Sequence, residues 1–277
     1  MAINKSDYEE PKCLLDMSDP AKSKVVPVDM GRVSAKLDEL LDRREWDRAE
    51  NLLSYWLSEA KNGFDRRGEF SILNEIAGLK RKLGKEAEAL EAAERAVSIG
   101  EELGIMDTVG GATAWLNLGT VYEAFGRAPD AVKAYEKVLP VYETFLNGSN
   151  PKLGGLYNNY AMSLALTEQY DKSFEYYRKA LDVMKQVPGG GIECALTYLN
   201  MANLCEAAMG LEEGAEKIED CLSKAQRLLD KEYKNDSGYY AFMADKCIET
   251  YEYYGWFMYA KELRERVKDI YDGLATR

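Results

Sequence analysis

Histidine is absent from all 277 residues of this sequence. The chain therefore has no histidine general base, no histidine metal ligand and no Ser–His or Cys–His nucleophile pair. Cysteine is scarce, and no two cysteines show the C-x-x-C spacing of a zinc ribbon or a thioredoxin-like motif. We expect no metal site, no cofactor, and an interior that holds the cysteines as reduced thiols: Cys13, Cys194, Cys205, Cys221 and Cys247.

Long hydrophobic runs are also missing. No apolar stretch approaches the roughly 20 residues that a transmembrane helix needs. The first ten residues, MAINKSDYEE, are polar and acidic, unlike a secretory signal. The sequence predicts a soluble, cytoplasmic protein with no membrane partner.

Positive charge is in deficit. The 36 lysine and arginine residues are outnumbered by 48 aspartate and glutamate residues, which gives a net charge of −12. Because an acidic surface repels the phosphates of DNA and RNA, we expect no nucleic-acid partner.

Motifs that indicate catalysis on nucleotide substrates are lacking as well. Gly189, Gly190 and Gly191 follow a predicted helix and Pro188, with no predicted strand before them. They therefore indicate a linker and not a dinucleotide-binding turn. No segment shows the period-two alternation of a β-strand. The sequence predicts an all-α protein that is not an enzyme.

What the sequence does contain is an internal repeat. In residues 112–146, Trp115, Leu118 and Tyr122 form one apolar stripe on a predicted helix. Gly119 and Ala131 are small, so two helices can approach closely there. Predicted turns recur at intervals of 40 to 45 residues, each five residues before a small residue: Arg44, Gly84, Gly126, Glu168, Gly210 and Gly255. A period of this length predicts a stack of about six helix–turn–helix units.

The units are expected at about 29–66, 67–107, 108–150, 151–190, 191–234 and 235–273, followed by a short tail at 274–277. Their helix pairs are predicted at 29–43 with 46–62, 68–83 with 85–103, 111–125 with 128–146, 153–168 with 171–187, 192–209 with 212–230, and 238–254 with 257–273. Residues 1–28 contain Pro11, Pro20 and Pro27, which predict an extended arm. Pro140 lies inside a predicted helix, where we expect a kink.

This spacing resembles the tetratricopeptide repeat (TPR). The period of about 42 residues and the run Tyr157-Asn158-Asn159-Tyr160-Ala161 resemble the repeats of kinesin light chains. The chain also resembles bacterial proteins built only from TPR units. The resemblance covers about residues 29–273. It implies a right-handed α-solenoid whose first helices line a concave groove for an extended peptide or a partner helix.

In that family an asparagine two positions before the small residue of the first helix often holds ligand backbone. Asn117, Asn159 and Asn200 match this position. An amide offers one acceptor and two donors, so it can pair with both groups of an extended backbone. The alternative is that these amides bond to the neighbouring repeat and stitch the solenoid together. The remaining residues expected in the groove are Asn74, Arg81, Thr120, Glu123, Asn158, Asn203, Glu206, Glu249 and Glu252.

Charge in the expected groove is uneven. Arg81 and Lys82 make it basic near the second unit, whereas Glu206, Glu249 and Glu252 make it acidic near the last two units. We expect a bound segment to carry lysine or arginine near these glutamates. The alternative is that the glutamates are solvated helix faces.

The sequence thus favours a non-catalytic scaffold or adaptor that holds a protein or peptide ligand. Two other functions stay open. One is a peptide-responsive regulatory sensor that acts through a separate effector chain. The other is a structural homo-oligomer joined through the last unit, whose many aromatic residues form either a capping core or a docking patch.

Overall fold

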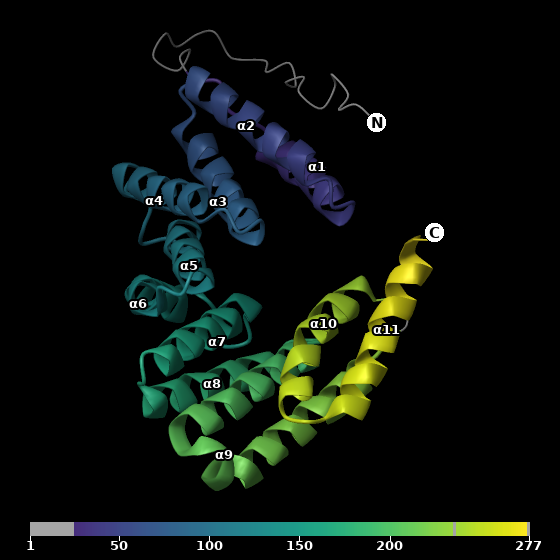
Figure 1. Cartoon of the computed structure of the whole chain (residues 1–277). Coiled ribbons are helices and arrows are strands. Elements are labelled where there is room, and N and C mark those ends of the chain that lie inside the picture. Colours follow the sequence, from purple (N-terminus) through teal and green to yellow (C-terminus); the bar gives the residue numbers. More distant parts are fainter. Residues whose placement is uncertain (1–24, 235–236, 276–277) are drawn as a thin grey trace. The chain divides into compact units, whose positions relative to one another are not determined.

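The computed structural model describes residues 25–234 and 237–275, and within those ranges every regular element is an α-helix (Figure 1). The chain divides into two compact units within α6, after Tyr142. The first unit contains α1 Met30–Asp42, α2 Trp46–Asn62, α3 Arg66–Lys82, α4 Glu86–Glu102, α5 Val109–Ala124 and most of α6 Ala128–Phe145. The second contains α7 Pro151–Leu166, α8 Tyr170–Met184, α9 Gly191–Glu232, α10 Gly238–Tyr253 and α11 Phe257–Ala275.

Parts of the predicted arm and tail, residues 1–24 and 276–277, lie outside the described residues. Within the described residues, no helix combines the length and the apolar character that crossing a membrane requires.

The turns between paired helices share a positive φ. All six predicted turn positions have positive φ, from 56° at Arg44 to 79° at Gly255. At Gly84 the amide donates to the Arg81 carbonyl, and the next amide donates back to the Lys80 carbonyl, at 3.1 and 2.9 Å. The same two bonds close the turns at Arg44, Gly126, Glu168 and Gly255. They satisfy carbonyls at the helix end that would otherwise lack partners.

The fifth turn differs from the others. The sequence predicts two helices at 192–209 and 212–230, whereas α9 extends from Gly191 to Glu232. Within it Gly210 is non-helical, with φ 78° and ψ 167°. We therefore describe α9 as a first segment, residues 191–209, and a second segment, residues 211–232.

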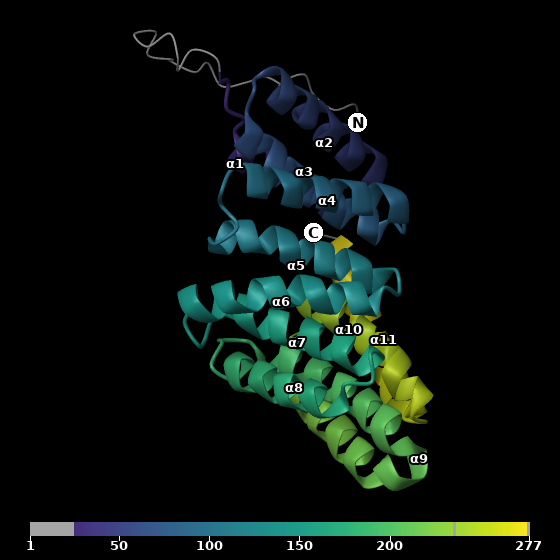
Figure 2. The same ribbon diagram turned by 90° about the vertical axis from the view of Figure 1, so that its left-hand side faces the viewer.

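Close packing in the first unit depends on a glycine. α3, α4 and α5 pack against one another in layers (Figure 2). At the α5–α6 pair, a Cβ added to Gly119 would lie 2.4 Å from the ring of Tyr135, which is fully buried. The small residue predicted at this position is therefore required by the fold. α6 continues through Pro140 as a helix.

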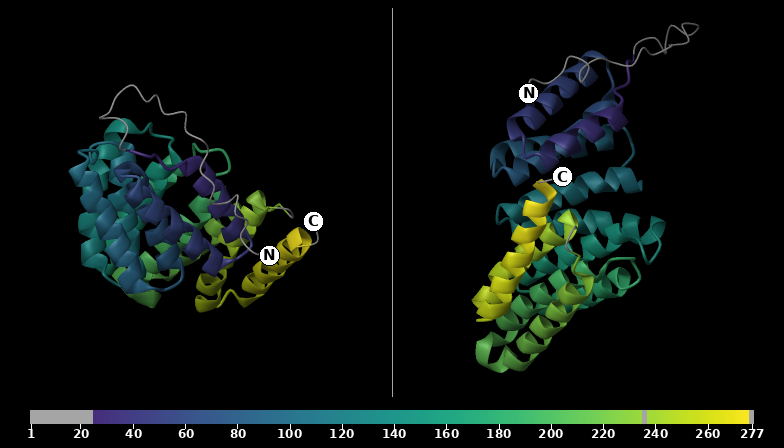
Figure 3. Two further views of the ribbon diagram at one scale, coloured as in Figure 1. Left: turned by 90° about the horizontal axis from the view of Figure 1, so that it is seen from above. Right: turned by 90° about the vertical axis from the view of Figure 1, so that its right-hand side faces the viewer.

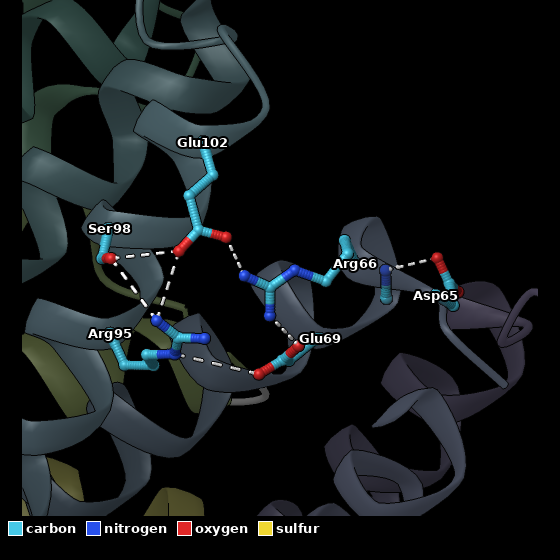
Figure 4. Close-up of polar contacts among 7 residues, drawn as sticks. Asp65, Arg66, Glu69, Arg95, Ser98 and Glu102 are labelled. Atoms are coloured by element: carbon cyan, nitrogen blue, oxygen red, sulfur yellow. Dashed lines mark hydrogen bonds and ion pairs between the residues drawn. The ribbon is translucent and has the colours of Figure 1, made fainter. Parts of the chain in front are cut away.

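Polar groups also join successive elements of the first unit. One carboxylate oxygen of Asp65 caps α3 by accepting the Gly68 amide at 2.9 Å, and the other accepts the Val28 amide at 2.8 Å. Asp65 thereby holds the segment before α1 against the start of α3. Beside it, Arg66 bonds both Glu69 and Glu102, linking α3 to α4 (Figure 4). The bond to Glu102 raises the pKa of the Arg66 guanidinium above its ordinary value.

A second charged cluster joins α2 to α3. The Glu50 carboxylate accepts from the ammonium groups of Lys80 and Lys85 at 2.8 and 2.6 Å. The hydrogen bonds from these two lysines lower the pKa of Glu50, whose side chain is 18% exposed.

The aromatic residues of the last helix pair divide into two groups. α10 and α11 form an antiparallel pair at the end of the second unit (Figure 3). Tyr240, Tyr251 and Tyr259 are buried in its core, as the capping interpretation predicts. Tyr253 and Phe257 are instead 64% and 66% exposed. Of the cysteines, Cys194, Cys205, Cys221 and Cys247 are buried free thiols, and Cys13 lies outside the described residues.

Candidate peptide-binding face

The residues predicted to bind peptide lie on the first helix of each pair. In the first unit α3 packs against α5, and in the second unit α7 packs against α9. Within each unit, neighbouring first helices thus place their polar side chains next to one another.

In the first unit two of the predicted amides bind each other. Asn117 on α5 donates from Nδ2 to Oδ1 of Asn74 on α3 at 2.8 Å. Asn74 donates its own amide to the Phe70 carbonyl at 2.9 Å. This is the contact expected if these amides join neighbouring repeats and do not bind ligand.

The second unit has a similar amide contact. Oδ1 of Asn158 on α7 accepts from Nδ2 of Asn200 at 3.3 Å and from the Thr197 hydroxyl at 3.1 Å, both on α9. Asn158 therefore joins the two first helices of successive repeats.

The other predicted residues of the first unit have local partners or face solvent. The Thr120 hydroxyl donates to the Asn117 carbonyl at 2.8 Å. Glu123 accepts from the Tyr135 hydroxyl at 3.2 Å. Arg81 is exposed near the end of α3, and the Lys82 ammonium lies 4.8 Å from the centre of the Trp46 ring.

Most of the predicted acidic side chains in the second unit are already engaged. Glu206 accepts from the hydroxyls of Tyr253 and Tyr254 at 2.6 and 2.8 Å. Tyr254 also donates to Asn203 at 3.1 Å. Desolvation, followed by the bond to Glu206, raises the pKa of Tyr254, which therefore stays protonated as a donor.

The remaining two glutamates lie on α10. Glu252 pairs with Arg264 of α11 at 2.6 Å, whereas Glu249 is exposed and has no ion pair within the described residues. Competition from tyrosine hydroxyls and Arg264 thus weakens the expected attraction of a basic ligand to Glu206 and Glu252.

Asn159 differs from the other predicted amides. It is half-buried, and its side chain makes no hydrogen bond within the described part of the chain. It lines a cavity of about 410 Å³ between α7, α9 and α10. The cavity is lined by Pro151, Lys152, Gly154, Gly155, Asn158, Asn159, Met184, Glu193, Leu196, Thr197, Tyr239 and Met243. Its size is within the range of small-ligand sites.

Glu193 is a charged cavity residue that is not among the predicted groove residues. It lies in the first turn of α9 and accepts a hydrogen bond from the Tyr239 hydroxyl of α10. A signal for it exists, because Glu193 is seven residues before Asn200 and so lies on the same helix face two turns earlier. Glu193 is nevertheless absent from the prediction, because the predicted groove residues of this helix begin at Asn200.

Comparisons with known proteins agree with this architecture. A family model described as tetratricopeptide repeat matches residues 68–144 and 153–227, more than half of the chain. A search of curated proteins found no match.

Several solved structures share the fold. BtubC (BKLC) from P. vanneervenii is 20% identical, with 73% of this chain and 80% of that one covered and a TM-score of 0.64. A putative kinesin light chain with nearly identical TPR-like repeats from Podosopora anserina is 18% identical, with 74% and 96% covered and a TM-score of 0.52. MamA is 15% identical, with 75% and 100% covered and a TM-score of 0.50. At these identities the likeness shows the fold alone.

Proposed function

Because this chain belongs to the tetratricopeptide repeat family, we propose that it is a non-catalytic scaffold that holds an extended peptide of a partner protein against the first helices of its second unit. The family match and the structural neighbours confirm the all-α TPR fold expected from the sequence. The fold is one that protein-interaction scaffolds use.

One observation carries the choice of site. Asn159 presents an amide that makes no hydrogen bond within the described part of the chain, at a cavity on the first-helix face. Such a group can accept from a peptide N–H and donate to a peptide C=O at once. Asn117 and Asn200, by contrast, already donate to neighbouring amides. The proposed contact with ligand therefore centres on Asn159.

Asparagine at this position has a cost for the fold. Inside a helix it is roughly 0.5 kcal/mol less favourable than alanine, and the Asn159 side chain gains no hydrogen bond to any residue that the structure describes. A role in binding accounts for its presence. The net charge of −12 supports a protein or peptide partner over nucleic acid.

The test is selection of peptides from a random phage-displayed library on the purified full-length chain, followed by fluorescence anisotropy with the selected peptides. We expect Asn159→Ala to weaken binding by about tenfold, the loss of one or two good hydrogen bonds. Circular dichroism should show that this variant stays folded.

Asn200→Ala is the matched control, because it removes an amide that is used inside the fold. It should change stability more than affinity. If no peptides are enriched, or if the enriched peptides bind wild type and Asn159→Ala equally, the proposal is wrong.

A further inference from the structure

The cavity between α7, α9 and α10 contains a carboxylate oxygen without a partner. Oε1 of Glu193 accepts from Tyr239, but Oε2 is buried and has no hydrogen-bond partner among the described residues. No cation pairs with Glu193 within the described residues. A buried carboxylate oxygen without a donor is unfavourable, and a donor from a bound ligand would satisfy it.

The lining of the cavity has room for an alkyl chain beside Glu193, and its one cationic residue, Lys152, is exposed at the start of α7. Leu196 and Met243 provide apolar wall on α9 and α10, and Met184 adds to it from α8. A lysine side chain buries its four-carbon stem against such a wall while its ammonium reaches an acceptor. The Asn159 carbonyl oxygen is a second acceptor on the same cavity.

The free oxygen also favours lysine over arginine. A guanidinium binds best with both oxygens of one carboxylate, in a planar two-bond arrangement. Tyr239 already donates to Oε1, so a guanidinium that bridges both oxygens would have to share Oε1 with that hydroxyl. An ammonium is a compact donor that needs a single acceptor on each of its N–H groups.

We propose that this cavity binds a lysine side chain of the peptide partner, with Oε2 of Glu193 accepting from the ammonium group. The inference rests on the proposed function, because it specifies one side chain of the peptide held there. It moves the basic residue expected in the ligand from Glu206, Glu249 and Glu252 to Glu193.

The experiment uses three blocked tripeptides, Ac-Ala-Lys-Ala-NH₂, Ac-Ala-Nle-Ala-NH₂ and Ac-Ala-Arg-Ala-NH₂, titrated into the full-length chain. Binding is followed by NMR at the amides of Gly154 and Gly155, which line the cavity. We expect the lysine peptide to bind about tenfold more tightly than the norleucine peptide, which matches its length without the charge. The arginine peptide should fall between them.

Variants then assign the preference to Glu193. Glu193→Gln should reduce the lysine-to-norleucine ratio to within about twofold, since an amide oxygen carries no charge. Glu249→Gln, which removes an exposed carboxylate from α10, should leave the ratio unchanged. Tyr239→Phe frees Oε1 and should raise the affinity of the arginine peptide.

Two results would overturn the inference. One is equal binding of the lysine and norleucine peptides to wild type, and the other is a lysine preference that survives in Glu193→Gln. Either result leaves the scaffold proposal standing if library-selected peptides still depend on Asn159. Loss of that dependence defeats the scaffold proposal separately.

Discussion

Glu168 occupies a turn at which four other repeats have glycine. Its φ is 60°, close to the 73° of Gly126 in the preceding repeat, and both turns are closed by the same two backbone hydrogen bonds. The Glu168 side chain is exposed. The residue is therefore held in a left-handed conformation by the repeat geometry, and replacing it with glycine should stabilise the protein.

The size of the effect follows from two opposing terms. A residue with a Cβ loses roughly 1–2 kcal/mol in the left-handed conformation. Glycine removes that loss but makes the unfolded chain more flexible, which costs about 0.4–1 kcal/mol. The net gain expected for Glu168→Gly is about 0.5–1 kcal/mol. Gly126→Ala should lose a similar amount, because a Cβ at Gly126 meets no atom within 4 Å and the change is conformational alone.

The assay is urea unfolding followed by circular dichroism, with the midpoint compared at constant m-value. Glu168→Ala is the matched control, since it removes the carboxylate and keeps the Cβ. Glu168→Gly should exceed both wild type and Glu168→Ala in stability. If Glu168→Gly is no more stable than Glu168→Ala, the left-handed turn is not a source of strain and the reasoning fails.

Three further substitutions test other contacts. Asp65→Ala removes the α3 cap and leaves the Val28 amide without its acceptor. We expect the free energy of unfolding, measured in urea, to fall by about 2–4 kcal/mol, and Asp65→Asn should keep part of this stability. Gly119→Ala places a Cβ against the buried Tyr135 ring and should cost about 1–3 kcal/mol, a loss that Tyr135→Leu relieves in the double variant. Glu50 has a pKa below its ordinary 4.5, so its contribution is complete above that pH and is lost as the pH falls through the lowered value. Glu50→Gln should therefore be about 1 kcal/mol less stable than wild type at neutral pH and equal to it in strong acid, and a constant difference at all pH values would contradict the assignment.

The turns show how far the repeat pattern reaches. Arg44 and Glu168 are not residue types that favour a left-handed turn, and the period alone predicts turns at both. Their positive φ values match that prediction. Period is informative here because the same two backbone hydrogen bonds close five of the six predicted turns, so a position in the repeat predicts the conformation of its equivalents. For these turns, position in the repeat predicts the backbone conformation better than residue type does.

Side-chain partners are harder to predict than turns. The sequence places Asn74 and Asn117 on one face, but whether an amide points to a ligand or to the next helix depends on the rotation and offset between neighbouring helices. Those angles are tertiary properties. For the same reason the two tyrosines that bind Glu206 lie about 48 residues away in sequence, beyond any local pattern.

In α7 the amide that joins two helices and the amide without a partner among the described residues are neighbouring asparagines. Both acceptor amides, Asn74 and Asn158, lie ten residues before the turns at Gly84 and Glu168. Asn159 lies one residue later, where its side chain lines the cavity and makes no hydrogen bond within the described residues. Asn117 at the equivalent position of α5 instead donates to Asn74. Alanine at Asn158 removes the acceptor of two hydrogen bonds and acts on the fold, whereas alanine at Asn159 removes none and acts on the ligand. The residue that joins the two helices, Asn158, and the residue proposed to bind ligand, Asn159, are thus neighbours in α7, and single substitutions can distinguish their roles.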